Sequence, residues 1–217
     1  MMKKSHPMIV AMTGASGSIY GLKLVRSLVE ANIPVIFMIS PAARLVFEKE
    51  LDLELPAQES DEFLQSLFTD EIAKHVELVR YRDIAASVAS GSYKTRGMII
   101  CPASMNTLAE VANGIASNLI SRSADVTIKE GRKLMIAPRE MPFSSIHLEN
   151  MLKLSKAGVC VMPPNPGFYH KPKKIDDLVD FVVGKMLDYF DVDHKLYKRW
   201  GTVDETVEEF QTLNNYR

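Results

Sequence analysis

Small and polar residues gather where an apolar run ends near the N-terminus, in the segment Thr13-Gly14-Ala15-Ser16-Gly17. The run before it, Met8 to Met12, has the length of a buried strand, and an apolar-periodic helix is expected from about Ile19 to Glu30. The two glycines would let the backbone approach a ligand, the serine supplies a hydroxyl, and free N–H groups at a helix start favour an anion. We therefore expect a phosphate-binding turn. The spacing matches neither G-x-G-x-x-G nor the Lys-containing P-loop, so a tight turn without a ligand is the alternative.

A second strand-to-helix turn has the same character. The expected strand Gly97 to Cys101 runs into Pro102-Ala103-Ser104-Met105-Asn106-Thr107, which offers three short hydrogen-bonding side chains. Because the carboxyl ends of parallel strands lie at one edge of a sheet, both turns would face one crevice. Ser104 could equally be only a helix N-cap. For Ser40, which ends the strand Pro34 to Ser40, a capping role is favoured over ligand contact.

Two cations share one face of a helix expected from Asn118 to Glu130. Arg122 and Lys129 are seven positions apart, hence two turns, and together could hold a phosphate. Asp125 between them makes an ordinary intrahelical salt-bridge ladder equally good. Further along, Lys185 borders the apolar stripe of the last helix, where it would reach solvent or extend into a site.

Charged and aromatic residues follow the last two strands. Arg139-Glu140 comes after the strand Lys133 to Pro138, as a paired ion bridge or a site, and Glu140 could move protons if burial raised its pKa. The proline-dense loop Pro163 to His170 could hold Tyr169 rigidly, or be only an anchored surface loop. The segment Ser90-Gly91-Ser92 is most simply a connector.

Composition indicates the elements that must position these residues. The chain has 217 residues, 47% of them hydrophobic, and a formal net charge of −1, which suits one compact α/β domain and argues against bulk nucleic-acid binding. Alternating strands and helices predict a doubly wound, mostly parallel sheet with helices on both faces. We expect a core at about 8–190 and an arm at about 191–217 that includes Trp200 and packs on a neighbour or frays.

Several function classes are disfavoured. Cys101 and Cys160 have no C-x-x-C spacing and indicate buried thiols in a reducing compartment, the histidines show no metal-ligand spacing, and no apolar run is long enough to span a membrane. A cytoplasmic protein without a metal is expected. From the pattern alone, the ligand is phosphorylated and lies at the carboxyl edge of the sheet, and no reaction is indicated.

The chain resembles the flavin prenyltransferase family, the UbiX-type and Pad-type flavoproteins, from about Ile9 to Trp200. The stretches that carry the resemblance are Thr13 to Gly17, Cys101 to Thr107, Arg122 to Val126, Pro138 to Met151 and Pro163 to His170.

The resemblance implies a flavodoxin-like or Rossmann-like sheet in a dodecamer built from trimers. It implies transfer of the dimethylallyl group of dimethylallyl monophosphate to reduced FMN, with bonds at N5 and then C6, release of phosphate, and no metal. The product, prenylated FMN, would serve a UbiD-type decarboxylase in ubiquinone biosynthesis or aromatic-acid decarboxylation.

The resemblance also assigns roles to residues. Gly14, Ala15, Ser16 and Ser40 would hold FMN, Arg139 would contact it, and the flavin would be lined by Ser104, Met105, Asn106 and Thr107. Tyr169 and Lys185 would bind the dimethylallyl phosphate with Arg122, Lys129, Ser90 and Gly91. Ser16 and Lys129 also count as catalytic, and Glu140 and Glu50, the latter from a neighbouring subunit, would serve proton transfer.

Two positions depart from relatives. Some relatives have arginine where this chain has Lys185; lysine keeps the charge but lacks the bidentate fork of arginine. Some relatives have tryptophan where this chain has Ile84, so this chain lacks that stacking surface for the prenyl group.

Two other activities are the alternatives. An FMN-dependent cysteine-type decarboxylase shares the motif Pro102 to Thr107 but carries a second Pro-x-Met-Asn clamp, where this chain has Pro138 to Met151. A non-catalytic flavin carrier would not need the basic residues Arg122, Lys129 and Lys185. A decarboxylase that acts directly on aromatic acids is a third way to interpret the family.

Overall fold

The computed structural model describes residues 6–199 except 53 and 57. One sheet of six parallel strands runs through this part of the chain in the order β3-β2-β1-β4-β5-β6. The strands are β1 (Met8–Met12), β2 (Val35–Ile39), β3 (Val76–Leu78), β4 (Gly97–Ala103), β5 (Leu134–Pro138) and β6 (Cys160–Val161). The central strands are buried along their whole length, which explains why they are apolar runs and do not alternate.

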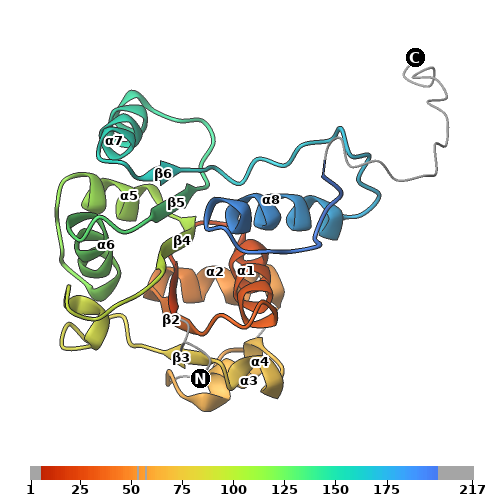
Figure 1. Cartoon of the computed structure of the whole chain (residues 1–217), viewed down its shortest axis with the longest axis horizontal. Coiled ribbons are helices and arrows are strands. Elements are labelled where there is room, and N and C mark those ends of the chain that lie inside the picture. The colour runs from red at the N-terminus through yellow and green to blue at the C-terminus, as the bar shows by residue number, and fades with distance from the viewer. Residues whose placement is uncertain (1–5, 53, 57, 200–217) are drawn as a thin grey trace.

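Helices cover both faces of the sheet, as predicted (Figure 1). One face carries α1 (Ser18–Glu30), α2 (Pro41–Leu51), α3 (Asp61–Leu67) and α8 (Ile175–Tyr189), whose side chains Leu24, Phe47, Phe63 and Val183 share one core. The other carries α5 (Met105–Ala112), α6 (Leu119–Lys129) and α7 (Ser145–Lys156), through Leu108, Ile120 and Leu154. The short helices α4 (Asp70–Ala73) and η1 (Ser87–Ala89) lie in connections.

Two strand boundaries differ from the prediction. The strand predicted over Val76 to Tyr81 pairs only through Leu78, because it is an edge strand with one neighbour, β2. Strand β4 continues past Cys101 to Ala103, so this thiol lies inside the sheet, where burial raises its pKa to about 12.

The described part of the predicted C-terminal arm packs on its own chain. In residues 191–199, His194 and Tyr197 pack on α8, and packing of the arm on a neighbouring copy stays a prediction. Trp200 and the rest of the arm lie outside the described residues.

Candidate functional site

Three turns meet at the carboxyl edge of the sheet, where β1 and β4 are neighbours. The Ser104 amide donates to Thr13 Oγ1 at 2.7 Å, and the Thr13 amide donates to the Pro102 carbonyl at 3.0 Å. From the end of β5, Arg139 Nε donates to the Ser16 carbonyl at 3.2 Å. The chain leaves β1 toward β2 on one side and enters β4 on the other, so this junction is the switch point at which open α/β sheets bind ligands.

Glycines shape the turn after β1. A Cβ on Gly14 would lie 2.5 Å from the Ala42 Cβ, so only glycine lets the turn pack on the start of α2. Gly17 has φ 111°, which favours glycine at the point where α1 begins. Ala15 is buried and its amide donates to the Thr13 carbonyl at 2.7 Å, whereas Ser16 is exposed.

Glu50 corrects two sequence-based expectations about this turn. Its carboxylate accepts hydrogen bonds from the amide of Gly17 at 2.9 Å and from the amide of Ser18 at 2.8 Å. The amides expected to be free for a phosphate are therefore occupied, and Glu50 reaches them from α2 of its own chain, not from a neighbouring subunit. Burial alone would raise the pKa of Glu50, but hydrogen bonds from Ser16, Ser18 and Gly17 lower it.

The serines at the ends of β2 and β4 cap helices. Ser40 Oγ accepts from the Ala43 amide at 3.1 Å and is buried, as the favoured capping interpretation predicts. Ser104 Oγ accepts from the Thr107 amide at 3.3 Å and lies 3.2 Å from Thr107 Oγ1. Thr107 is buried, Met105 is half-buried and Asn106 is exposed at the edge, so only part of this motif is open to a ligand.

The predicted cations on α6 lie beside the Ser90-Gly91 loop. Arg122 Nε donates to the Ala89 carbonyl at 3.2 Å, and a Cβ on Gly91 would lie 2.9 Å from Lys129 Nζ. Asp125 pairs with Arg122 at 2.9 Å but not with Lys129, whose ion pair is with Glu130. The expected ladder is therefore only half formed, and the loop, Arg122 and Lys129 make one polar cluster, called here the α6 cluster.

The other two expected substrate residues lie elsewhere. Tyr169 packs against Phe181 of α8 with ring centroids 5.5 Å apart, and Lys185 is an exposed residue of α8. Since α8 and α6 cover opposite faces of the sheet, Tyr169 and Lys185 are not joined to the α6 cluster within this part of one chain (Figure 1).

Glu140 is not buried, although burial was the expected cause of a raised pKa that would suit it to proton transfer. Its side chain is exposed at the carboxyl end of β5, where Oε1 accepts from the Met141 amide at 3.0 Å. Ile84, where some relatives have tryptophan, is 68% exposed on the loop before η1.

Two structural contributors were missed from the sequence. Arg132 donates to the Gly91 carbonyl at 2.6 Å and to the Tyr93 carbonyl at 2.8 Å, and so fixes the loop of the α6 cluster. Thr13 joins β1 to β4 through its hydroxyl. Arg132 belongs to no motif, because it acts through contacts with distant backbone. Thr13 opens the predicted turn motif, and only its hydrogen bonds to β4 could not be foreseen from the sequence.

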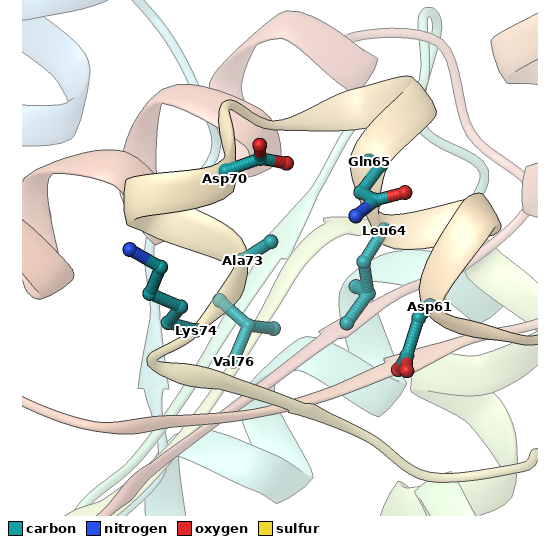
Figure 2. A pocket seen from close by; sticks show the side chains of 7 residues that line it. All are labelled: Asp61, Leu64, Gln65, Asp70, Ala73, Lys74 and Val76. Atoms are coloured by element: carbon teal, nitrogen blue, oxygen red, sulfur yellow. The ribbon is translucent and has the colours of Figure 1, made fainter.

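A pocket at the opposite edge does not extend this site. Figure 2 shows it between α3, α4 and the start of β3, with about 560 Å³ lined partly by Asp61, Asp70 and Lys74. Val76 in its wall pairs with Val35, the first residue of β2, so the pocket lies at the amino edge of the sheet. Its mixed, exposed charges define no ligand.

The fold and the joined turns at the switch point are those of a ligand-binding, doubly wound α/β protein. The model of the flavoprotein family matches residues 1–187, which makes the protein a flavoprotein. The chain belongs to the UbiX flavin prenyltransferases and is a transferase. It is 47% identical over 194 residues to the flavin prenyltransferase UbiX of Alkalihalophilus pseudofirmus, covering 89% of this chain and 96% of the relative.

Two solved structures share the fold. One is AnUbiX (PadA1) in complex with FMN and dimethylallyl pyrophosphate, with TM-score 0.81, 37% identity, and coverage of 92% of this chain and 100% of that one. The other is a dodecameric FMN-dependent UbiX-like decarboxylase from Escherichia coli O157:H7, with TM-score 0.77, 41% identity, and coverage of 89% and 98%.

Residues 6–199, apart from 53 and 57, contain no cluster of three or more histidine, cysteine or acidic side chains suited to a metal. Within that span, none of the helices has the length and apolar character needed to cross a membrane.

Proposed function

We propose that this protein joins the dimethylallyl group of dimethylallyl monophosphate to N5 and C6 of reduced FMN, giving prenylated FMN and phosphate. The observation that carries the proposal is the α6 cluster, a second cationic site apart from the flavin edge. A flavin carrier needs only one anion site, whereas this transfer needs a place for the leaving phosphate. Binding of FMN and dimethylallyl pyrophosphate by AnUbiX supports the same assignment.

The carboxyl edge between β1 and β4 suits a flat flavin. Gly14, Ser16 and Ser104 present no bulky side chain there, and Arg139 lies against the turn through its bond to Ser16. We assign FMN contacts to Gly14, Ala15, Ser16, Ser40, Ser104, Met105, Asn106, Thr107 and Arg139. For the buried members of this set the contacts would be through backbone atoms. Reduced FMN supplies the electron-rich ring that accepts the prenyl group.

Lys129 and Arg122 would stabilise the negative charge that grows on the departing phosphate. Preorganised cations of this kind lower a barrier because they need not reorient as charge develops. The Ser90-Gly91 loop would complete the phosphate contacts, and Tyr169 and Lys185 would hold the substrate from a second side.

Ser16 and Glu50 would manage a proton at the flavin edge. The Ser16 hydroxyl donates to the Glu50 carboxylate, whose lowered pKa keeps it ionised. Because a lowered pKa makes the carboxylate a weak base, it would hold a proton only transiently and pass it on. Glu140, which is exposed in the single chain, would serve proton transfer only if a neighbouring copy covers it.

The separation of the α6 cluster from Tyr169 and Lys185 supports a site shared between copies. A homo-oligomer is also supported by α7, where Ile146, Leu148 and Leu152 are 55–66% exposed on one helix. We propose a dodecamer, as in the Escherichia coli relative. That residues 1–217 form one flavoprotein domain, that the protein is cytoplasmic and that a UbiD-type decarboxylase receives the product are further parts of the proposal. They rest on the resemblance.

The test is anaerobic incubation with reduced FMN and dimethylallyl monophosphate, followed by mass analysis of the extracted flavin and a phosphate assay. A flavin heavier by one prenyl unit, with phosphate released, supports the transfer. Dimethylallyl pyrophosphate in a parallel reaction decides which phosphate ester is used. Unmodified FMN from folded, flavin-loaded protein would overturn the proposal, and carbon dioxide release from a cysteine peptide or an aromatic acid would point to a decarboxylase.

A further inference from the structure

Asp188, near the end of α8, is the centre of a hydrogen-bond cluster that the proposed chemistry does not use. Its Oδ1 accepts from Arg199 Nη2 at 2.6 Å and lies 3.1 Å from His194 Nε2, and its Oδ2 accepts from the Tyr197 hydroxyl at 2.5 Å. Partial burial would raise the pKa of Asp188, but hydrogen bonds from Arg199, Tyr197 and His194 lower it to about 2. One carboxylate therefore fastens the segment 194–199, called here the C-terminal strap, to α8.

The strap is also fitted to α8 by shape. A Cβ on Gly184 would lie 2.7 Å from both His194 Cε1 and Tyr197 Cδ1, so glycine at this position admits the two rings. The His194 and Tyr197 rings pack on each other with centroids 5.2 Å apart. His194 is 4% exposed in its side chain, so the strap is a packed element and not a loose tail.

The strap reaches Tyr169 through one aromatic ring. Tyr197 packs on Phe181 at 5.3 Å between centroids, and Phe181 contacts Tyr169 edge-on at 5.5 Å. Phe181 also stacks with His170, with 5.0 Å between centroids and 11° between planes. A cavity of about 370 Å³ is bounded by Tyr169 and His170 from the loop and by Tyr197 and Arg199 from the strap.

We infer that Asp188 is a positioning residue: by holding the strap on α8 it fixes Tyr197 and Phe181, and through them the ring of Tyr169 at the substrate phosphate. The inference rests on the proposed role of Tyr169. It requires no contact between Asp188 and substrate, because the carboxylate acts only through the strap.

The test compares FMN-loaded wild-type protein with Asp188→Asn and Asp188→Glu. Asp191→Asn is the matched control, since Asp191 lies beside the strap and pairs with Lys133 at 2.7 Å, and asparagine tolerates its left-handed backbone. Each protein is assayed for the KM of dimethylallyl monophosphate, for kcat and for FMN affinity. Brief trypsin digestion after Lys195, Lys198 and Arg199 then reports how firmly the strap is held.

We expect Asp188→Asn to raise KM about tenfold or more with FMN affinity within about twofold of wild type, because a displacement near 1 Å in a positioning group can cost about a hundredfold. Trypsin should cut the strap of this variant faster, Asp188→Glu should restore much of both properties, and Asp191→Asn should match wild type. Tyr197→Phe, which keeps the ring but loses the hydroxyl, should show the same KM change to a smaller degree.

An opened strap with wild-type KM and kcat would overturn the inference, as would unchanged digestion of Asp188→Asn. If Asp188→Asn also loses FMN, the Tyr197→Phe variant decides by the same two readouts. If the wild-type protein does not prenylate FMN, the proposed function is wrong. The claim that Asp188 positions Tyr169 at the substrate phosphate is then also wrong. The digestion pattern still decides whether Asp188 holds the strap.

Discussion

Lys129 is weakly held by contacts within its own chain. Its ion pair in the described structure is with the adjacent Glu130, and its side chain is 48% exposed. Such a surface pair contributes at most about 1 kcal/mol, so the ammonium can turn to a bound phosphate at low cost.

Lys129→Ala should lower the rate of prenyl transfer by about 10²–10³-fold, the usual effect of losing one preorganised group that stabilises developing charge. FMN binding should persist, because the flavin edge lies at the other turns. Steady-state rates and flavin titration check both points, with Lys156→Ala at the end of α7 as a matched control. Normal turnover in Lys129→Ala would remove its assigned role.

The lowered pKa of Glu50 predicts how the free energy of unfolding depends on pH. Its folded-state pKa is lowered, so its stabilising contribution is present above the ordinary value of 4.5 and is lost as pH falls through the folded value. Glu50→Gln should therefore lower the free energy of unfolding at pH 7 by about 0.5–1 kcal/mol, a helix-terminus effect kept small by exposure.

The difference between Glu50→Gln and wild type should shrink between pH 5 and pH 3. Urea unfolding at one fixed protein concentration, repeated across that range, measures it. A difference that stays constant with pH would show that the carboxylate charge on the α1 amides contributes nothing.

Helix α1 packs against the sheet at Gly21 with no room for a side chain. A Cβ on Gly21 would lie inside contact distance of the Cys101 carbonyl and the Met12 side chain, so the helix would have to move away from β1 and β4. The same movement would displace the turn at Gly14 to Gly17 that begins α1.

Gly21→Ala should destabilise the fold by about 1–3 kcal/mol, the usual cost of overpacking, and weaken FMN binding. Ser27→Ala is the control at another buried position of α1, because Ser27 Oγ has no hydrogen-bond partner within the described residues and its loss should be nearly neutral. Thermal unfolding of the two variants side by side separates a specific close approach from general sensitivity of α1.

The whole molecule places the α6 cluster and the pair Tyr169 and Lys185 on opposite faces of one sheet. If copies share the site, the Lys129→Ala and Lys185→Ala variants should each have low prenyl-transfer activity. Activity should return in part when the two variant oligomers are dissociated, mixed and reassembled. Random mixing would restore up to about a quarter of the sites, because a complete site needs both native residues from different copies. Absence of any recovery in mixed assemblies of confirmed composition would mean that the site lies within one copy.

The exposed apolar face of α7 makes a related prediction about assembly. Replacing Leu148 and Leu152 by glutamate should dissociate the oligomer, because it puts charge into a surface that association would bury. Light scattering measures the mass. Gln65→Glu, on α3 at the distant edge, adds charge without touching α7 and should leave the mass unchanged.

The order of strands and helices follows from the sequence alone, because buried parallel strands are apolar runs and their helices carry apolar stripes. The turns at Thr13 and Ser104 also follow from the sequence alone. Small polar residues between a buried strand and a helix favour a tight turn, and few other conformations would connect the two elements. The capping role of Ser40 could likewise be predicted from the sequence, because its side chain accepts a hydrogen bond from the amide of Ala43, only three residues away.

Contacts between distant segments were decided by the tertiary structure. Glu50 takes the α1 amides from another helix, Arg132 fixes the Gly91 loop, and Asp188 collects partners from the strap. The separation of Lys129 from Tyr169 has the same origin. Each depends on which face of the sheet a helix covers and where a long side chain ends, and periodicity along the chain carries neither kind of information.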